Sequence, residues 1–119
     1  MKFSIARNNK VLIKEAYLYK GFKAGMGLRF CKQIKNDEAI LIERERESIL
    51  DSTIDMLFVF FSIDVIWMDE NKKIVDIKTA RPFQLFSTPC KPAKYILEVK
   101  QGNGLKFKIN DKLAFIPRK

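Results

Sequence analysis

The residues of this chain that are able to carry chemistry are few, and the most unusual are two isolated carboxylates. Asp64 lies between Ile63 and Val65, and Glu98 lies within the apolar stretch YILEVK, so we expect both side chains to be buried. A buried charge is costly unless it is paired or hydrogen-bonded. Each carboxylate is therefore either a ligand contact or a structural acceptor for backbone N–H groups or a nearby arginine, and the structural role is the commoner one.

Two arginines are candidate partners for these carboxylates. If Arg29 or Arg81 converges with Asp64 and Glu98, the group forms either a structural ion-pair network or the floor of a pocket. An enzyme that used Asp64 and Glu98 would have two carboxylates and no nucleophile. That pattern is only weak support for catalysis.

Histidine is absent from the sequence, and only two cysteines are present. The lack of histidine removes the commonest general base and the commonest metal ligand. Cys31 and Cys90 are too few to form a zinc site by themselves, and we expect both to be reduced thiols. We therefore expect no metal and no cofactor, and the sequence favours a protein that is not an enzyme.

Aromatic residues supply a second kind of candidate. Trp67, and the rings of Tyr17, Tyr19, Phe22 and Phe30, are able to stack on nucleic-acid bases or on sugars, and lysines lie between them. Packing in the core is the alternative, and it is favoured by the four-residue spacing of Phe22 and Phe30 with other apolar residues.

The net charge of +9 is distributed unevenly along the 119 residues. Residues 1–36 and 77–119 are strongly basic, whereas residues 37–76 are acidic. Basic ends are able to bind phosphates of RNA or single-stranded DNA, or to face an acidic surface of the same protein. The 17 lysines against six arginines favour a merely solubilising role, because bidentate recognition of phosphates and bases uses arginine.

The chain length and hydropathy pattern predict one domain over residues 1–119. The start of the sequence carries charges where a signal peptide has an apolar run, and the uncharged stretch 56–63 is too short to span a bilayer. We therefore expect a cytoplasmic protein, monomeric or homodimeric, that has no membrane contact.

Alternating apolar residues and turn signals predict a mostly β fold. We expect strands at residues 2–6, 11–16, 39–47, 53–61, 64–68, 74–79, 94–100, 105–109 and 112–116. The charges beyond Ile42 favour an edge position for 39–47. The run TIDMLFVFF is expected to be a buried strand beside 64–68. One short or broken helix is expected within 17–34, where Leu18, Phe22, Met26, Phe30 and Ile34 share a face. Together these elements predict a small antiparallel β-barrel, closed or partly open, of about seven to nine strands.

Four segments, in order, resemble a known family. They are Gly25–Phe30 (GMGLRF), Met56–Phe60 (MLFVF), Ile63–Ile66 with the turn Met68–Asn71, and Tyr95–Val99 (YILEV) followed by Gly102. The pattern is similar to that of the domain of unknown function 192 family, although an aromatic insertion before the Asp strand is missing and Asn110-Asp111 replaces a Gly-Asp pair. The resemblance implies a compact barrel-like fold and brings no activity or cofactor.

These observations favour a non-enzymatic binding module that uses a basic rim or a pocket at the barrel mouth. The residues that we expect to contact its ligand or protein partner are Arg29, Asp64, Arg81, Glu98 and Trp67. Nucleic-acid binding through the basic ends is the first alternative. An enzyme based on Asp64 and Glu98 is the second.

Overall fold

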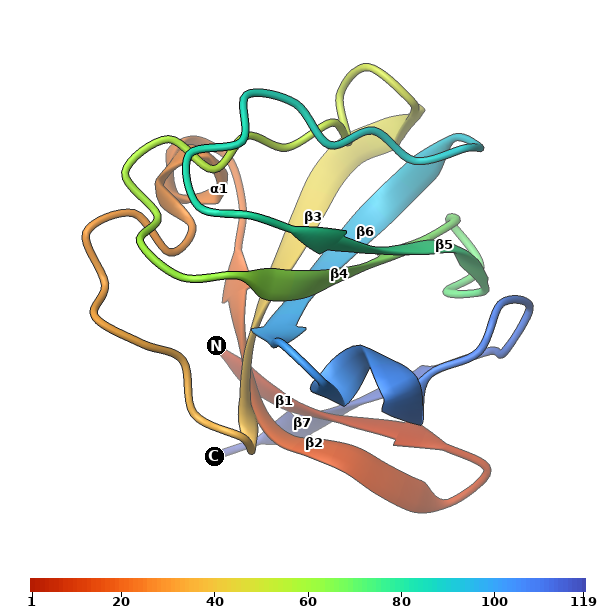
Figure 1. Ribbon diagram of the computed structural model, residues 1–119. Helices are drawn as coiled ribbons and strands as arrows, with labels where there is room; N and C mark the ends of the chain where they lie inside the picture. The colour runs from red at the N-terminus through yellow and green to blue at the C-terminus, as the bar shows by residue number, and fades with distance from the viewer.

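The fold is a single, strongly curled sheet of seven strands (Figure 1). The computed structural model describes residues 1–119 except for the side chain of Phe22, so the expectation for that ring lies outside the described residues. The sheet order is β5-β4-β6-β3-β2-β1-β7. The strands are β1 (Lys2–Arg7), β2 (Lys10–Tyr19), β3 (Glu38–Ser48), β4 (Ile63–Met68), β5 (Ile74–Ala80), β6 (Ala93–Lys100) and β7 (Ala114–Arg118).

The mostly β class is confirmed, and the closed antiparallel barrel is not. β5 and β7 remain as the two edges of the sheet, so the wall is open. Neighbouring strands are antiparallel except β2 and β3, which run parallel with Tyr17 opposite Ile40. A parallel pair needs a long crossover, and here residues 20–37 supply it.

The hairpins are formed where the turn residues predict them. Asn8 and Asn9, between β1 and β2, both have positive φ (50° and 68°), as a two-residue hairpin turn requires. Between β4 and β5, the Asp69 carboxylate accepts hydrogen bonds from the backbone N–H groups of Asn71 and Lys73. The turn chemistry of asparagine and aspartate thus fixes the register of both hairpins.

Three of the expected elements are wrong. The run 53–61 is a loop, joined to residue 87 through a single bridge at Ile54, and it is not a strand beside β4. The expected strand 105–109 is replaced by the 3₁₀ turn η1 (Asn103–Lys106) and a following turn. The helix expected within 17–34 shrinks to α1 (Phe22–Met26), because Leu18 belongs to β2 and the glycines at 21, 25 and 27 disfavour a longer helix.

The position of β3 also differs from the prediction. β3 lies in the middle of the sheet between β2 and β6, and its apolar half, Ala39–Ile42, is buried. The charged half, residues 43–47, extends beyond the end of β2 and pairs irregularly with β6. β3 is therefore a central strand along Ala39–Ile42, whereas residues 43–47 have no neighbouring strand on the β2 side. This second half carries the charges that are typical of an edge strand.

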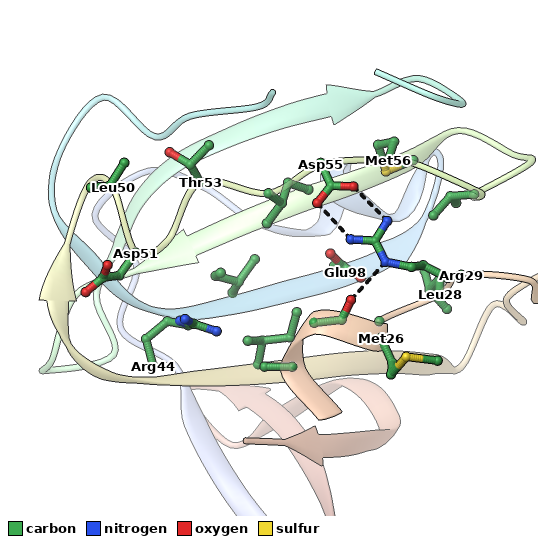
Figure 2. A pocket seen from close by; sticks show the side chains of 17 residues that line it. Met26, Leu28, Arg29, Arg44, Leu50, Asp51, Thr53, Asp55, Met56 and Glu98 are labelled. Carbon is green, nitrogen blue, oxygen red and sulfur yellow. Dashed lines mark hydrogen bonds and ion pairs between the residues drawn. The ribbon is translucent and has the colours of Figure 1, made fainter. Parts of the chain in front are cut away.

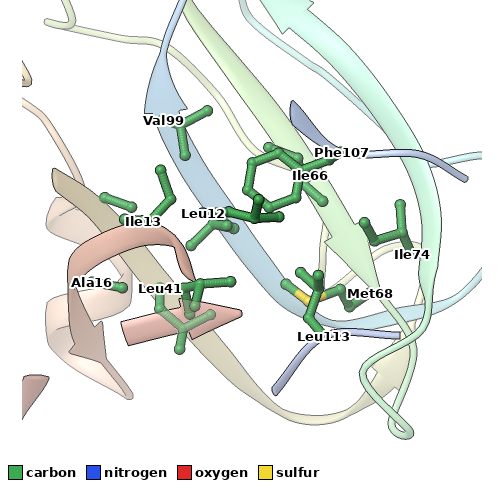
Figure 3. Packing of buried hydrophobic residues seen from close by; sticks show 13 residues of the cluster. Leu12, Ile13, Ala16, Leu41, Ile66, Met68, Ile74, Val99, Phe107 and Leu113 are labelled. Atoms are coloured by element: carbon green, nitrogen blue, oxygen red, sulfur yellow. The ribbon is translucent and has the colours of Figure 1, made fainter. Parts of the chain in front are cut away.

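The central strands are buried on both faces by two separate hydrophobic clusters. One cluster fills the inside of the curl, where Leu41, Ile66 and Leu97 meet residues of β1, β2 and the segment after η1 (Figure 3). The other lies on the opposite face, where Ile42, Trp67 and Ile96 are covered by α1 and the loop 50–59. The second layer consists of loops rather than of a sheet or long helices, and it contains the cavity described below.

The described helices are all too short and too polar to cross a bilayer.

Candidate functional site

A cavity of about 270 Å³ lies between the sheet and its loop layer (Figure 2). Its floor is formed by Ile42 of β3 and by Ile96 and Glu98 of β6. Its walls are the turn that follows α1 and the loop 50–59. Because β3 and β6 are neighbouring antiparallel strands, Ile40 and Glu98 form a register pair and point to the same face of the sheet.

Glu98 is the most unusual group of the cavity. The residue is 5% exposed, its carboxylate faces the cavity, and no described residue donates a hydrogen bond to it. Burial raises the pKa of Glu98 to about 7, although the charge of Arg29 opposes this and that of Asp55 adds to it. Near neutral pH the carboxyl is therefore distributed between its protonated and ionised forms, and it lines an open space.

Arg29 fastens the two walls of the cavity to each other. Its guanidinium donates two parallel hydrogen bonds of 2.7 Å to the Asp55 carboxylate and one of 2.6 Å to the carbonyl oxygen of Leu57. Its Nε donates to the carbonyl oxygen of Gly25. The hydrogen bonds to Arg29 lower the pKa of Asp55, and those to Asp55 raise the pKa of Arg29. Arg29 therefore joins the turn after α1 to the loop 50–59 and also lines the cavity.

Arg44 lies at the other end of the same cavity. Its Nε is buried and has no hydrogen-bond partner among the described residues. Arg44 follows Ile40, the register partner of Glu98, by four residues along β3. At ~3.3 Å per strand residue, the two backbones are separated by roughly 13 Å. The cavity therefore has a carboxyl group at one end and an unsatisfied cationic donor at the other.

Asp64 lies on the opposite face of the sheet from Glu98. Val65 is the register partner of Glu98, so its neighbour Asp64 points the other way. The Asp64 carboxylate accepts hydrogen bonds from the backbone N–H groups of Gly102 (2.8 Å) and Gly104 (2.9 Å) and from the Thr79 hydroxyl (2.8 Å). A Cβ added at Gly104 would lie 2.7 Å from the Asp64 carboxylate, so glycine is required for this approach.

The remaining two expected residues also lie apart from the cavity. Trp67 is fully buried, and its Nε1 donates a 2.7 Å hydrogen bond to the carbonyl oxygen of Ser52. Arg81 is exposed and lines a shallow hollow with Phe83 and Gln84. Of the five expected residues, the structure brings only Arg29 and Glu98 to one cavity. Asp64 and Glu98 share none, which removes the geometric basis for an enzyme that uses this pair.

Arg44 and Asp55 were missed by the sequence analysis. Arg44 belongs to the run ERERE, in which Arg44 and Arg46 each lie between two glutamates, so the sequence does not distinguish them. The register is what singles it out, since Ile40, Ile42 and Arg44 share the face that carries Glu98. Both cysteines are free and exposed. Within the described part of the chain, no group of three or more histidine, cysteine, aspartate or glutamate residues is placed to hold a metal ion.

Comparison with known proteins gives one family. The model of the DUF192 family, described as "Uncharacterized ACR", matches residues 6–115. A UPF0127 protein of Pyrococcus abyssi is 32% identical over 115 residues, which cover 95% of this chain and 92% of the relative. A UPF0127 protein of Thermococcus kodakarensis is 35% identical over 97 residues, which cover 82% of this chain. The match spans only 57% of that longer relative.

A solved structure has the same fold. The crystal structure of a protein of unknown function from Novosphingobium aromaticivorans superposes with a TM-score of 0.83 and covers 96% of this chain and 84% of that one. The sequence identity of the pair is 17%, so this likeness concerns the fold alone.

Proposed function

We propose that this chain, which belongs to the domain of unknown function 192 family, is a non-enzymatic module that binds a small polar ligand in the cavity beside Glu98. The observation that carries the proposal is the buried Glu98 carboxyl group, which lines open space and receives no hydrogen bond from a described residue. Buried polar groups are nearly always satisfied, and exceptions concentrate at functional sites. A ligand that donates a hydrogen bond there would satisfy the group.

The two ends of the cavity indicate the chemical class of the ligand. Glu98 favours a donor such as an ammonium or hydroxyl group, whereas the unpartnered Nε of Arg44 favours an acceptor such as a carboxylate. Since a water molecule takes about 30 Å³ in the liquid, a cavity of about 270 Å³ has room for a molecule of amino-acid or monosaccharide size. We therefore expect a compact zwitterion or polyol.

The experiment compares three sets of probes by calorimetry and by the fluorescence of Trp67. The sets are free amino acids, the amines and carboxylic acids that lack one of their two charged groups, and monosaccharides. Trp67 is the single tryptophan and packs in the cluster that forms the cavity floor, so its emission should respond to binding. We expect the free amino acids or the monosaccharides to bind and to raise the melting temperature.

Two variants decide whether the cavity is the site. We expect Glu98→Gln and Arg44→Gln each to weaken binding about tenfold or more, as the loss of a charge-assisted hydrogen bond does. Glu70→Gln, which removes an equal charge from an exposed turn away from the cavity, should bind as the unaltered protein does. Binding that survives both cavity substitutions, or no binding by any probe, would reject the proposal.

Nucleic-acid binding remains the second candidate, and one feature favours it. β1 and β7 pair in the sheet, with Lys2 opposite Arg118, so the two basic ends of the chain lie side by side (Figure 1). A phosphate-binding surface should lose affinity steeply with salt. Titration of RNA and single-stranded DNA at two salt concentrations tests it, and an absent or salt-independent signal rejects it.

A further inference from the structure

Three loops at one end of the molecule expose a cluster of aromatic rings. Phe30 stacks on Phe58 with ring centroids 5.0 Å apart, Phe83 contacts Phe58 edge-on at 6.0 Å, and Phe60 contacts Phe83 at 5.2 Å. These four side chains are 42–64% exposed. Leu57, Leu85 and Phe86, from the same loops, are also exposed. We refer to these seven residues as the aromatic cluster.

The backbone of the three loops is joined so that the rings stay together. The backbone N–H of Phe30 donates to the carbonyl oxygen of Phe58 (2.9 Å), and that of Phe83 donates to the carbonyl oxygen of Met56 (3.0 Å). The cluster is therefore part of the ordered structure of the loop layer. It is not a set of unrelated exposed side chains.

Phe30, Phe58 and Phe83 share a strained backbone conformation. Their φ angles are 63°, 60° and 61°, in the left-handed region that bulky side chains avoid. Such a conformation costs on the order of 1 kcal/mol per residue and is concentrated at functional sites. All three residues adopt this unfavourable conformation, and their rings are nevertheless exposed. This combination indicates that the exposed aromatic surface itself has a role.

Two of the three loops are basic, and the third, 53–62, has no basic side chain. Residues 20–35, 53–62 and 81–92 contain seven basic side chains, and their one acidic side chain, Asp55, is ion-paired with Arg29. Lys32 and Arg81 are exposed and lie two positions from Phe30 and Phe83. Among the described residues, neither Lys32 nor Arg81 has an ion-pair partner. The cluster thus combines protruding aromatic rings with flanking positive charge.

We propose that the aromatic cluster docks this protein onto the surface of an anionic lipid bilayer. Aromatic and leucine side chains enter the boundary between headgroups and acyl chains, while lysines and arginines contact anionic headgroups. A second copy of the chain fits this surface less well. A two-fold contact brings the same patch of both copies together, and would oppose two strongly basic surfaces. Such docking needs no membrane-spanning helix. The expectation of no membrane contact was based on the lack of a spanning segment, so it does not apply to docking at the surface.

The test is co-sedimentation of the full chain with vesicles of phosphatidylcholine alone or mixed with phosphatidylglycerol. We expect binding to the anionic vesicles that weakens as salt is added. Replacing Phe30, Phe58 and Phe83 by asparagine together should reduce the partition coefficient at least a hundredfold, since each buried ring contributes roughly tenfold. Asparagine tolerates the left-handed region, so the variant should fold and melt at the same or a higher temperature.

Two further variants complete the design. Leu105→Asn is the matched control, because Leu105 is 90% exposed on η1 and does not belong to the aromatic cluster, so we expect vesicle binding to be unchanged. Lys32→Glu with Arg81→Glu should weaken binding to anionic vesicles about tenfold or more. These residues lie outside the cavity, so ligand binding there should be retained whatever the vesicle result.

Three outcomes would overturn the proposal. The first is no binding of the unaltered protein to anionic vesicles. The second is equal binding by the triple asparagine variant. The third is a dimer in analytical ultracentrifugation that the triple variant converts to a monomer while vesicle binding is absent, since the cluster would then be a contact between copies.

Discussion

Two carboxylates on neighbouring strands, Asp64 of β4 and Glu98 of β6, have nearly the same burial and opposite surroundings. Asp64 is 6% exposed and accepts three hydrogen bonds, two of them from the backbone around η1. Glu98 is 5% exposed, receives none from a described residue and lines a cavity. Burial alone therefore does not separate a structural carboxylate from a candidate ligand contact. Hydrogen-bond satisfaction separates them.

The largest effect that this comparison predicts is the destabilisation caused by Asp64→Ala. The substitution leaves the backbone N–H groups of Gly102 and Gly104 without their acceptor in a tightly packed turn. We expect the free energy of unfolding to fall by about 4 kcal/mol, measured by chemical denaturation. Asp64→Asn, which keeps one acceptor oxygen, should lose less. A loss below about 1 kcal/mol for alanine would mean that Asp64 does not hold η1.

Glu98→Gln should have the opposite sign. The pKa of Glu98 is raised from 4.5 to about 7 in the folded protein, so between these values the folded state holds a proton that the unfolded state has released. Stability of the unaltered protein therefore falls as pH rises through this window. At pH 8 the variant should be more stable by about 3 kcal/mol, and at pH 4 the two should be nearly equal.

Denaturation curves of the two proteins at several pH values check this prediction. The Asp55 contribution lies below this window, because a pKa lowered from 3.8 means that its stabilising interactions are lost only as pH falls below that ordinary value. The difference between the two proteins isolates Glu98, because Asp55 is common to both. A difference that does not change with pH would show that Glu98 ionises as freely in the folded state as in the unfolded one.

A smaller effect is expected for Arg29→Lys, which tests how the cavity wall is held. Lysine keeps the charge but cannot make the paired hydrogen bonds to the Asp55 carboxylate or span to the carbonyl of Leu57. We expect a loss of about 1 kcal/mol, because the ion pair is partly exposed. Amide hydrogen exchange in residues 55–59 should quicken, while exchange in the Asp64-bound turn at 102–104 should not. Equal acceleration in both turns would point to global destabilisation instead.

The hairpins and most strands could be predicted from the sequence because their signals are local. The apolar run in 64–68, the alternation in 74–79 and the Asp69 turn between them are sufficient for the β4–β5 hairpin. Pairing partners are not local. The parallel contact of β2 with β3, and the central place of β3, depend on where distant strands lie, and the charges of 43–47 indicated an edge instead.

The loop 53–61 shows why the site was harder to predict than the fold. A continuous apolar run is typical of a buried strand, yet here Met56 and Val59 are buried against the sheet, while Leu57, Phe58 and Phe60 are exposed. Ile54 and Phe61 are partly buried and pack against the same cluster as Met56 and Val59. One side of this run forms the cavity wall and the other forms the exposed aromatic surface. Because both sides are apolar, the sequence shows no hydrophobic period here. For the same reason Asp64 and Glu98 looked equivalent, since each is one acid within an apolar strand and only the tertiary structure supplies or withholds donors.

The Glu98 carboxyl group lines the cavity and receives no hydrogen bond from a described residue, so its titration tests the proposed site most directly. Nuclear magnetic resonance of glutamate side-chain carboxyl carbons, with Glu98→Gln used to assign the signal, reports the pKa of this group. We predict a midpoint near 7 for the free protein, and a shift of that midpoint when a cavity ligand is added. A midpoint at the ordinary value of 4.5 would contradict it, because the carboxylate would then be solvated or already paired.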